Sequence, residues 1–206
     1  MSNRTTITIN KMVSMSGCYP AWRARNRRVG RSEQGTTQPT RQDGRVDQQE
    51  HDPPDSAFDG LRRLALTWVS EGLGTPSLQH PDVSGVVVDV PADGGFAMVV
   101  ALADDTTSQY TSTGGGTIGA GTHPVVARAN RRLLIAAQVH LGLITSPDDG
   151  SLPPAGAVRL HVLTHTGARC ADVPEDAFWG GSPHALSPLI AAVQSVVSAI
   201  REHAPS

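Results

Sequence analysis

The residues with the clearest chemical potential lie in a glycine-rich stretch, 111–124, which reads TSTGGGTIGAGTHP. Gly114, Gly116 and Gly119 fit the spacing G-x-G-x-x-G, which lets a backbone approach a phosphate group closely. The stretch follows an expected strand and precedes an expected helix, whose free N–H groups would attract an anion. The pattern therefore indicates a candidate ligand site.

The candidate ligand-binding residues are the glycines of this loop and the two residues that follow them: Gly114, Gly115, Gly116, Gly119, Gly121, Thr122 and His123. Thr122 is expected to cap the following helix, with Pro124 in its first turn. The classical nucleotide fingerprints are absent, because no Lys-Ser or Lys-Thr pair follows and no acidic residue stands about 20 positions on. The alternative is that the glycines only supply positive φ angles and tight packing of the helix on the sheet.

A second candidate surface lies on the stretch 157–165, AVRLHVLTH, whose alternation predicts a strand. Arg159, His161, Leu163 and His165 then share one face, which we expect to be exposed and to meet a partner. The two histidines would stand about 13 Å apart, at about 3.3 Å per residue, too far to share one metal ion. We predict no metal site, cofactor or catalytic residue, since no C-x-x-C, H-E-x-x-H or G-x-S-x-G motif occurs.

The elements that must position these residues begin with an amphipathic helix. Ser56 and Asp59 are spaced as a capping box, and Gly72 and Gly74 are expected to end the helix. Its apolar stripe consists of Phe58, Leu61, Leu64, Ala65, Trp68 and Val69. Further along, the strands 83–90 and 96–103 are expected to form a hairpin, followed by a third strand at 108–113.

The second half of the chain is expected to hold a helix from about Thr122 to 144, strands at 157–165 and 167–173, and a last helix from Ser187. The order is therefore α-β-β-β-α-β-β-α. Consecutive short strands joined by hairpins predict an α+β domain with an antiparallel sheet of about five strands and three helices. Small bacterial secretion-chaperone-like domains share this order, which is an analogy of topology only.

The chain divides by composition into a tail and one domain. Residues 1–55 show no periodic apolar pattern and are expected to form a disordered tail, interpreted as a non-functional extension, whereas 56–206 form a single α+β domain. The whole chain has 17 Lys and Arg against 19 Asp and Glu, so we expect no binding to nucleic acid.

The cysteines and the hydropathy pattern predict the compartment. Cys18 and Cys170 lie far apart in the sequence, so that a structural disulfide is not expected. No apolar run reaches the roughly 18 residues that a membrane helix needs, and the N-terminus lacks the apolar core of a secretory signal. We therefore expect a cytoplasmic protein without a membrane partner.

The glycine stretch, together with the later stretches RLHVLTHTG and HALSPLI, resembles a family of uncharacterised bacterial proteins. The likeness covers roughly residues 84–190, and its most specific part is the signature strand–T/S-x-GGG-x-I-G-x-G-x-H–helix. That family has no established activity, so the resemblance implies no catalytic residue. It implies that the glycine loop belongs to the design of the domain.

Three functions fit these observations. The first is a non-enzymatic protein-interaction domain that binds a protein partner or a second copy of itself. The alternative is the binding of a small ligand or anion, such as a phosphate or nucleotide, at the glycine loop and the start of the following helix. The third, a hydrolase or acyl-transfer enzyme, would pair Ser112 or Thr113 with His123 beside the amides of the loop.

Overall fold

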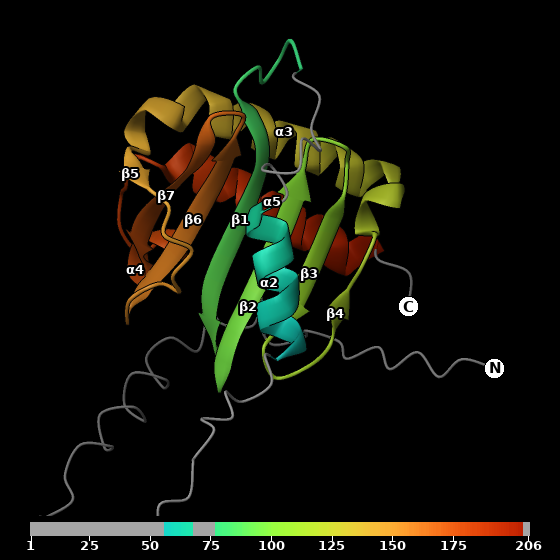
Figure 1. Cartoon of the computed structure of the whole chain (residues 1–206), viewed down its shortest axis with the longest axis vertical. Coiled ribbons are helices and arrows are strands. Elements are labelled where there is room, and N and C mark those ends of the chain that lie inside the picture. Colours follow the sequence, from blue (N-terminus) through green and yellow to red (C-terminus); the bar gives the residue numbers. More distant parts are fainter. Residues whose placement is uncertain (1–55, 68–76, 204–206) are drawn as a thin grey trace, which may run out of the picture. The chain divides into compact units, whose positions relative to one another are not determined.

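The described residues form an α+β domain around one antiparallel sheet (Figure 1). The computed structural model describes residues 56–67 and 77–203. The strands are β1 (Val83–Ala92), β2 (Gly95–Leu102), β3 (Thr107–Thr111), β4 (Gly116–Thr117), β5 (Ser146–Pro147), β6 (Ala157–Thr164) and β7 (Gly167–Pro174). They lie in the order β4-β3-β2-β1-β6-β7-β5, so that β1 is the central strand.

The helices cover the two faces of the sheet unequally. They are α2 (Ala57–Thr67), α3 (Pro124–His140), α4 (Glu175–Phe178) and α5 (Ser187–His203), with the 3-10 turns η4 (Ala120–Thr122) and η5 (Leu141–Leu143). The long helices α3 and α5 pack side by side on one face, which we call the back face (Figure 1). The front face carries α2, which packs on Val87, Met98, Val100, Leu102 and Leu163.

The long elements follow the predicted order α-β-β-β-α-β-β-α, and the predicted antiparallel α+β class is confirmed. The predicted numbers of strands and helices were too low, because the described residues hold seven strands and four α-helices. The additional strands, β4 and β5, have two residues each, and the additional helix, α4, has four. Such short elements have no hydrophobic period from which they could be predicted.

The central hairpin of β1 and β2 has the predicted form. Gly94, at φ 78°, occupies the turn, and Val90 pairs with Ala97 on the two antiparallel strands. On its other side β1 pairs with β6, with Val87 opposite His161. Because β1 is covered on both faces, its sequence is an almost continuous apolar run rather than an alternating one.

The N-terminal helix agrees with its predicted capping. The hydroxyl of Ser56 accepts a hydrogen bond from the backbone N–H of Asp59 at 3.1 Å and donates one to the Asp59 carboxylate at 2.6 Å. Phe58 and Ala65 are buried as expected, whereas Leu64, also placed on the apolar stripe, is 51% exposed. The remaining predictions for this helix, on Trp68, Val69, Gly72 and Gly74, lie outside the described residues.

The predicted tail, residues 1–55, also lies outside the described residues, and the interpretation of that segment stays a prediction. Within 56–67 and 77–203, no helix is long and apolar enough to cross a membrane. The buried apolar side chains of the described residues come from both the strands and the helices.

Candidate functional site

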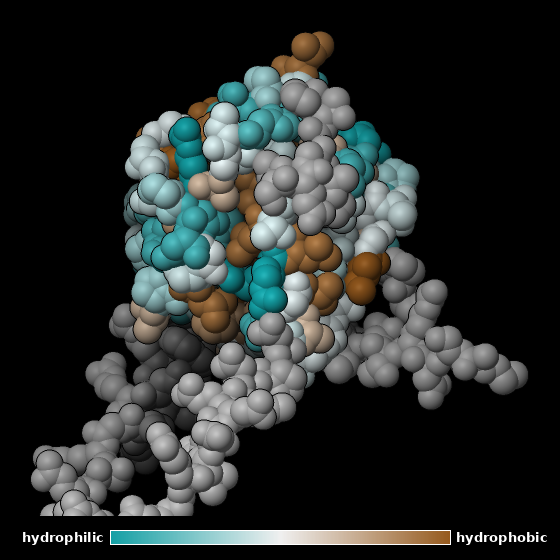
Figure 2. Space-filling model, viewed as in Figure 1, coloured by the Kyte–Doolittle hydropathy of each residue, from teal (hydrophilic) through white to brown (hydrophobic). Residues whose placement is uncertain are grey.

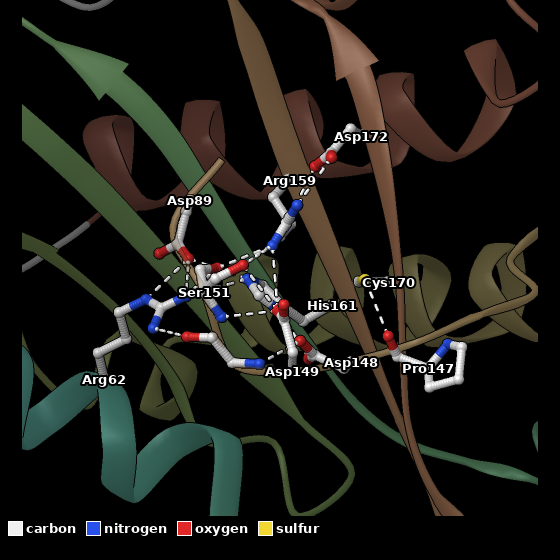
Figure 3. A network of polar contacts seen from close by, with 11 residues as sticks. Arg62, Asp89, Pro147, Asp148, Asp149, Ser151, Arg159, His161, Cys170 and Asp172 are labelled. Carbon is white, nitrogen blue, oxygen red and sulfur yellow. Dashed lines mark hydrogen bonds and ion pairs between the residues drawn. The ribbon is translucent and has the colours of Figure 1, made fainter. Parts of the chain in front are cut away.

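Four charged side chains form a buried network on the front face of the sheet, beneath α2 (Figure 3). Arg62 comes from α2, Asp89 from β1, His161 from β6, and Asp148 from the segment that follows β5. Asp89 and His161 are both 0% exposed. Ionisable side chains are rarely buried to this degree unless they are paired, so the network is the candidate site.

The guanidinium group of Arg62 connects α2 to the sheet and to the segment after β5. Its Nε lies 2.8 Å and its Nη2 2.6 Å from Oδ2 of Asp89. Its Nη1 donates to the carbonyl of Gly150 at 2.5 Å, and its Nη2 to the carbonyl of Ser151 at 2.9 Å. One carboxylate and two carbonyls therefore surround this cation, which suits the planar fork of an arginine.

The imidazole of His161 lies between two carboxylates. Its Nδ1 is 2.6 Å from Oδ2 of Asp148, and its Nε2 is 2.9 Å from Oδ2 of Asp89. An ionised carboxylate can only accept hydrogen bonds, so the form of the ring that satisfies both carboxylates is the positively charged one, in which both nitrogens donate. Burial disfavours that charge, but the hydrogen bonds to Asp148 and Asp89 outweigh it and raise the pKa of His161.

The two carboxylates differ in how the network satisfies them. Burial alone would raise the pKa of Asp148, but the hydrogen bond and charge of His161 outweigh it and lower the pKa. Asp89 receives Arg62 and His161 on the same oxygen, Oδ2, while its Oδ1 is buried without a hydrogen-bond partner among the described residues. The stability of a buried Asp89 therefore depends on the two cations at Oδ2.

A second ion-pair group lies next to this network on β6 and β7. Arg159 forms a bidentate pair with Asp172 on the adjacent strand, at 2.7 and 2.8 Å, and the pKa of Arg159 is raised chiefly by this hydrogen bonding. Nη1 of Arg159 also contacts the hydroxyl and the carbonyl of Ser151 and lies 3.3 Å from Asp149. The segment after β5 is thus held by both arginines.

The contacts of the network join α2 to β1, to β6 and to the segment after β5. Both nitrogens of His161 are already engaged, so neither can take a proton from a substrate. Cys170, opposite His161 on β7, is buried and donates weakly to the carbonyl of Pro147 at 3.6 Å. Burial raises the pKa of this thiol, which favours the unreactive protonated form. No group of three His, Cys, Asp or Glu in the described ranges could hold a metal ion.

The predicted partner face on β6 is largely buried and not exposed as we expected. Arg159, His161 and Leu163 do share one face of β6, but His161 and Leu163 are 0% exposed and only His165, beyond the end of the strand, is exposed. The prediction that this face is open was wrong, because α2 covers Leu163 and the segment 148–151 covers the two polar side chains. Alternation identifies residues that share a face, but not what covers it.

The predicted glycine site is a hairpin followed by a 3-10 turn. Gly114 and Gly115, at φ 95° and 96°, form the turn between β3 and β4, and Gly119 precedes η4 at φ 70°. A Cβ at Gly116 would lie 2.2 Å from a backbone oxygen of β3, and one at Gly121 would lie 1.8 Å from another backbone oxygen. Each of these glycines is thus required by a positive φ angle or by a close backbone contact. Ligand binding at this loop stays a prediction.

The start of α3 is capped by a different residue from the one predicted. His123, not Thr122, is the N-cap, and its Nδ1 accepts the N–H of Val125 at 3.3 Å. The Thr122 hydroxyl instead donates to the carbonyl of Gly119 at 3.0 Å, within η4. The ring of His123 stacks on His203 of α5, with centroids 4.7 Å apart. The helix therefore begins one residue later than predicted, because η4 takes up Thr122.

Three members of the network, Arg62, Asp89 and Asp148, were not among the predicted site residues. Arg62 interrupts the apolar stripe of α2, and Asp89 stands inside the apolar run VVVDV of β1. Both residues could have been found from this pattern, because a charged residue among neighbours that are predicted to be buried indicates a buried ion pair. Asp148 was interpreted as a turn carboxylate, and nothing in the local sequence distinguishes it from Asp149.

Comparisons with protein-family models, with curated proteins and with solved structures found no match for this chain. The resemblance of residues 84–190 to an uncharacterised family stays a prediction.

Proposed function

We propose that this domain is a non-enzymatic protein-interaction domain that binds through the front face of its sheet. The observation that carries the proposal is the unequal covering of the two faces. The back face is covered by α3 and α5, of 17 residues each, whereas on the front face the 11-residue α2 buries only Phe58, Arg62 and Ala65.

The front face presents apolar side chains that are only partly covered. We call this group the front patch: Leu61, Leu64, Leu66, Phe96 and Tyr110. Figure 2 shows apolar side chains, in brown, next to α2 on this face. A cluster of apolar side chains at a surface is typical of a protein-binding site, because a partner that covers it removes this area from water.

The buried network supports this proposal by positioning α2. Arg62 is the polar anchor of a helix that supplies three members of the front patch, Leu61, Leu64 and Leu66. A partner would therefore meet a surface whose shape is set by a hydrogen-bonded arginine. Preorganisation of this kind reduces the entropy cost of binding.

The enzymatic alternative has little geometric support. The hydroxyl of Ser112 accepts the backbone N–H of Phe96 at 2.9 Å, and His123 serves as a helix cap. The anion-binding alternative at the glycine loop is weaker than protein binding, since His123 already accepts an N–H at the helix start. The analogy with secretion-chaperone-like domains rests on the predicted order of elements alone and adds no function of its own.

Site-specific photo-crosslinking tests the proposal. A photoreactive residue replaces Leu64, which is 51% exposed on the front face, or Val139, which is 72% exposed on α3 and serves as the matched control. Exposure to light in the cells that make the protein should give a discrete protein adduct from position 64 and none from position 139. No adduct at position 64, or equal adducts at both positions, would overturn the proposal.

A further inference from the structure

The outer side of the helical layer carries a groove between α3 and α5, with a volume of about 510 Å³. Its lining includes Arg128 and Arg132 of α3 and Ala191, Ser195, Ser198 and Glu202 of α5. A second hollow of about 360 Å³, next to α4, shares Ala191 and Gln194 with this groove. The two hollows therefore form one continuous depression, which we call the α3–α5 groove.

Arg128 and Arg132 give one wall of the groove a positive charge. Both side chains are exposed, and neither forms a hydrogen bond or an ion pair within residues 56–67 and 77–203. They stand four residues apart on one face of α3, where like charges repel and reduce the stability of the helix. The helix contains no acidic residue that could compensate them, and its third arginine, Arg131, pairs with Asp105 instead.

Glu202 is the one acidic residue among the described residues that line the groove. Its carboxylate lies 3.8 Å from Arg201 and 4.0 Å from His203, both on the same helix. Residues 56–206 contain more acidic than basic residues, so the domain had acidic side chains to place opposite Arg128 and Arg132 and placed none. An uncompensated pair of cations of this kind attracts an anionic partner.

The α5 side of the groove offers neutral hydrogen-bonding groups. The Ser195 hydroxyl donates to the carbonyl of Ala191 at 2.8 Å, and Nε2 of Gln194 donates to the carbonyl of Phe178 at 2.6 Å. The oxygens of both side chains can therefore accept a further hydrogen bond, and the Ser198 hydroxyl forms none within the described part of the chain. Such groups suit a polypeptide backbone, which has a donor and an acceptor at each residue.

The dimensions of the groove fit an extended segment better than a helix. Residues 191–202 of α5 span roughly 16 Å at about 1.5 Å per residue. A helix about 10 Å wide and of that length would occupy roughly 1,200 Å³, more than twice the volume between α3 and α5. Arg128 and Arg132 stand about 6 Å apart along α3, and alternate side chains of an extended segment stand about 6.6 Å apart on one face. Acidic residues at alternate positions therefore match the two arginines.

We propose that the α3–α5 groove binds an extended acidic segment of a partner protein, with carboxylates at alternate positions paired to Arg128 and Arg132. The planar fork of each guanidinium group fits a carboxylate, and the side chains of Gln194 and Ser195 accept N–H groups of the bound backbone. This surface goes beyond the proposed function, because it lies on the outer side of α3 and α5 and not on the front patch.

A defined peptide tests the proposal on the full chain. The probe is a short fluorescein-labelled peptide of alternating glutamate and alanine residues, and its binding is followed by fluorescence anisotropy. Binding should saturate and weaken as the salt concentration rises, whereas a peptide with glutamine in place of glutamate should not bind. No saturable binding up to about 1 mM protein, or equal binding of the glutamine peptide, would overturn the proposal.

Charge variants locate the bound peptide. Arg128→Gln and Arg132→Gln should each raise the Kd about two- to fivefold, as the loss of one exposed ion pair does, and the double variant about tenfold. Arg131→Gln is the matched control, because it removes the same charge from the same helix outside the groove, and it should leave the Kd unchanged. An equal rise in the control would mean that the peptide responds only to net charge and would refute the site.

A steric variant tests the groove without a change of charge. Ala191 is exposed where the two hollows meet, so Ala191→Tyr should block the groove and abolish binding. Val139→Tyr, at a position of α3 that is 72% exposed and outside the lining, should bind as the wild-type chain does. Full affinity in Ala191→Tyr would overturn the proposal. A loss of binding in Leu64→Ala would assign the peptide to the front patch, so the failure of this proposal and that of the proposed function can be distinguished.

Discussion

The substitution Arg62→Met tests whether the buried network holds α2 on the sheet. Methionine keeps most of the apolar stem and removes the guanidinium group, so that packing next to Phe58 and Ala65 changes little. Asp89 then keeps only His161 at Oδ2, and its Oδ1 already has no hydrogen-bond partner among the described residues. The carbonyl of Gly150 loses this donor at the same time, and the carbonyl of Ser151 keeps only Nη1 of Arg159.

The expected loss of folding stability is the loss that follows when a buried ion pair is broken. Removal of one partner from such a pair costs about 3–5 kcal/mol, because the other charge stays buried without compensation. The side chains of Arg62 and Asp89 are 10% and 0% exposed, so the buried case applies. Detachment of α2 would let water reach Asp89 and would reduce the loss, so about 3 kcal/mol is the more appropriate figure from this range. For a domain of this size it corresponds to a fall in Tm of roughly 6–12 °C.

The assay is urea unfolding of the full chain, followed by circular dichroism, with Arg131→Met as the control. Arg131 pairs with Asp105 at the surface, with side chains 57% and 31% exposed, and its loss should lower the free energy of unfolding far less than the loss of Arg62. A loss for Arg62→Met no larger than that of the control would refute the reasoning. It would mean that the network contributes no more to the free energy of unfolding than a surface ion pair does.

Three further predictions concern pH, a close contact and a helix cap. The pKa of His161 is raised in the folded chain, so protonation of this ring stabilises the fold. Its contribution to the free energy of unfolding is complete below the pKa of the unfolded chain, about 6.5, and is lost as pH rises through the pKa of the folded chain. Urea unfolding at pH 6 and pH 9 should show the lower free energy of unfolding at pH 9, and equal values would contradict this. Gly121→Ala would place its Cβ 1.8 Å from a backbone oxygen and should lower Tm, whereas Gly142→Ala, which meets nothing within 4 Å, should not. Thermal melts that rank the two alanine variants equally would be evidence against this packing. His123→Ala should cost about 0.5–2 kcal/mol as the loss of an N-cap, and Thr122→Ala less; chemical denaturation that reverses this order would disprove the assignment of the cap.

Much of the fold could be predicted because the signals that define it are local. The hairpin of β1 and β2 follows from two apolar runs around the turn at Gly94, and the capping box at Ser56 marks the start of α2. The strands β4 and β5 could not be predicted in this way. Their two residues pair with neighbouring strands only because the chain returns to the edge of the sheet.

The candidate site was the part least accessible to prediction. Alternation on β6 correctly grouped Arg159, His161 and Leu163, yet the expected exposed face is closed. The residues that close it come from α2 and from the segment after β5, about 100 and 13 positions from His161 in the sequence. A pattern within one strand contains no information about elements at such a separation.

The sequence by itself determined the class of the domain, the order of its long elements and the faces of its strands, since these depend on hydrophobic periods and turn residues within about ten to twenty positions. Only the tertiary structure decided that Arg62, Asp89, His161 and Asp148 meet beneath α2. The physical reason is that a charged side chain becomes buried when distant elements bring an opposite charge to it. That pairing is a property of the packed chain and not of any single element.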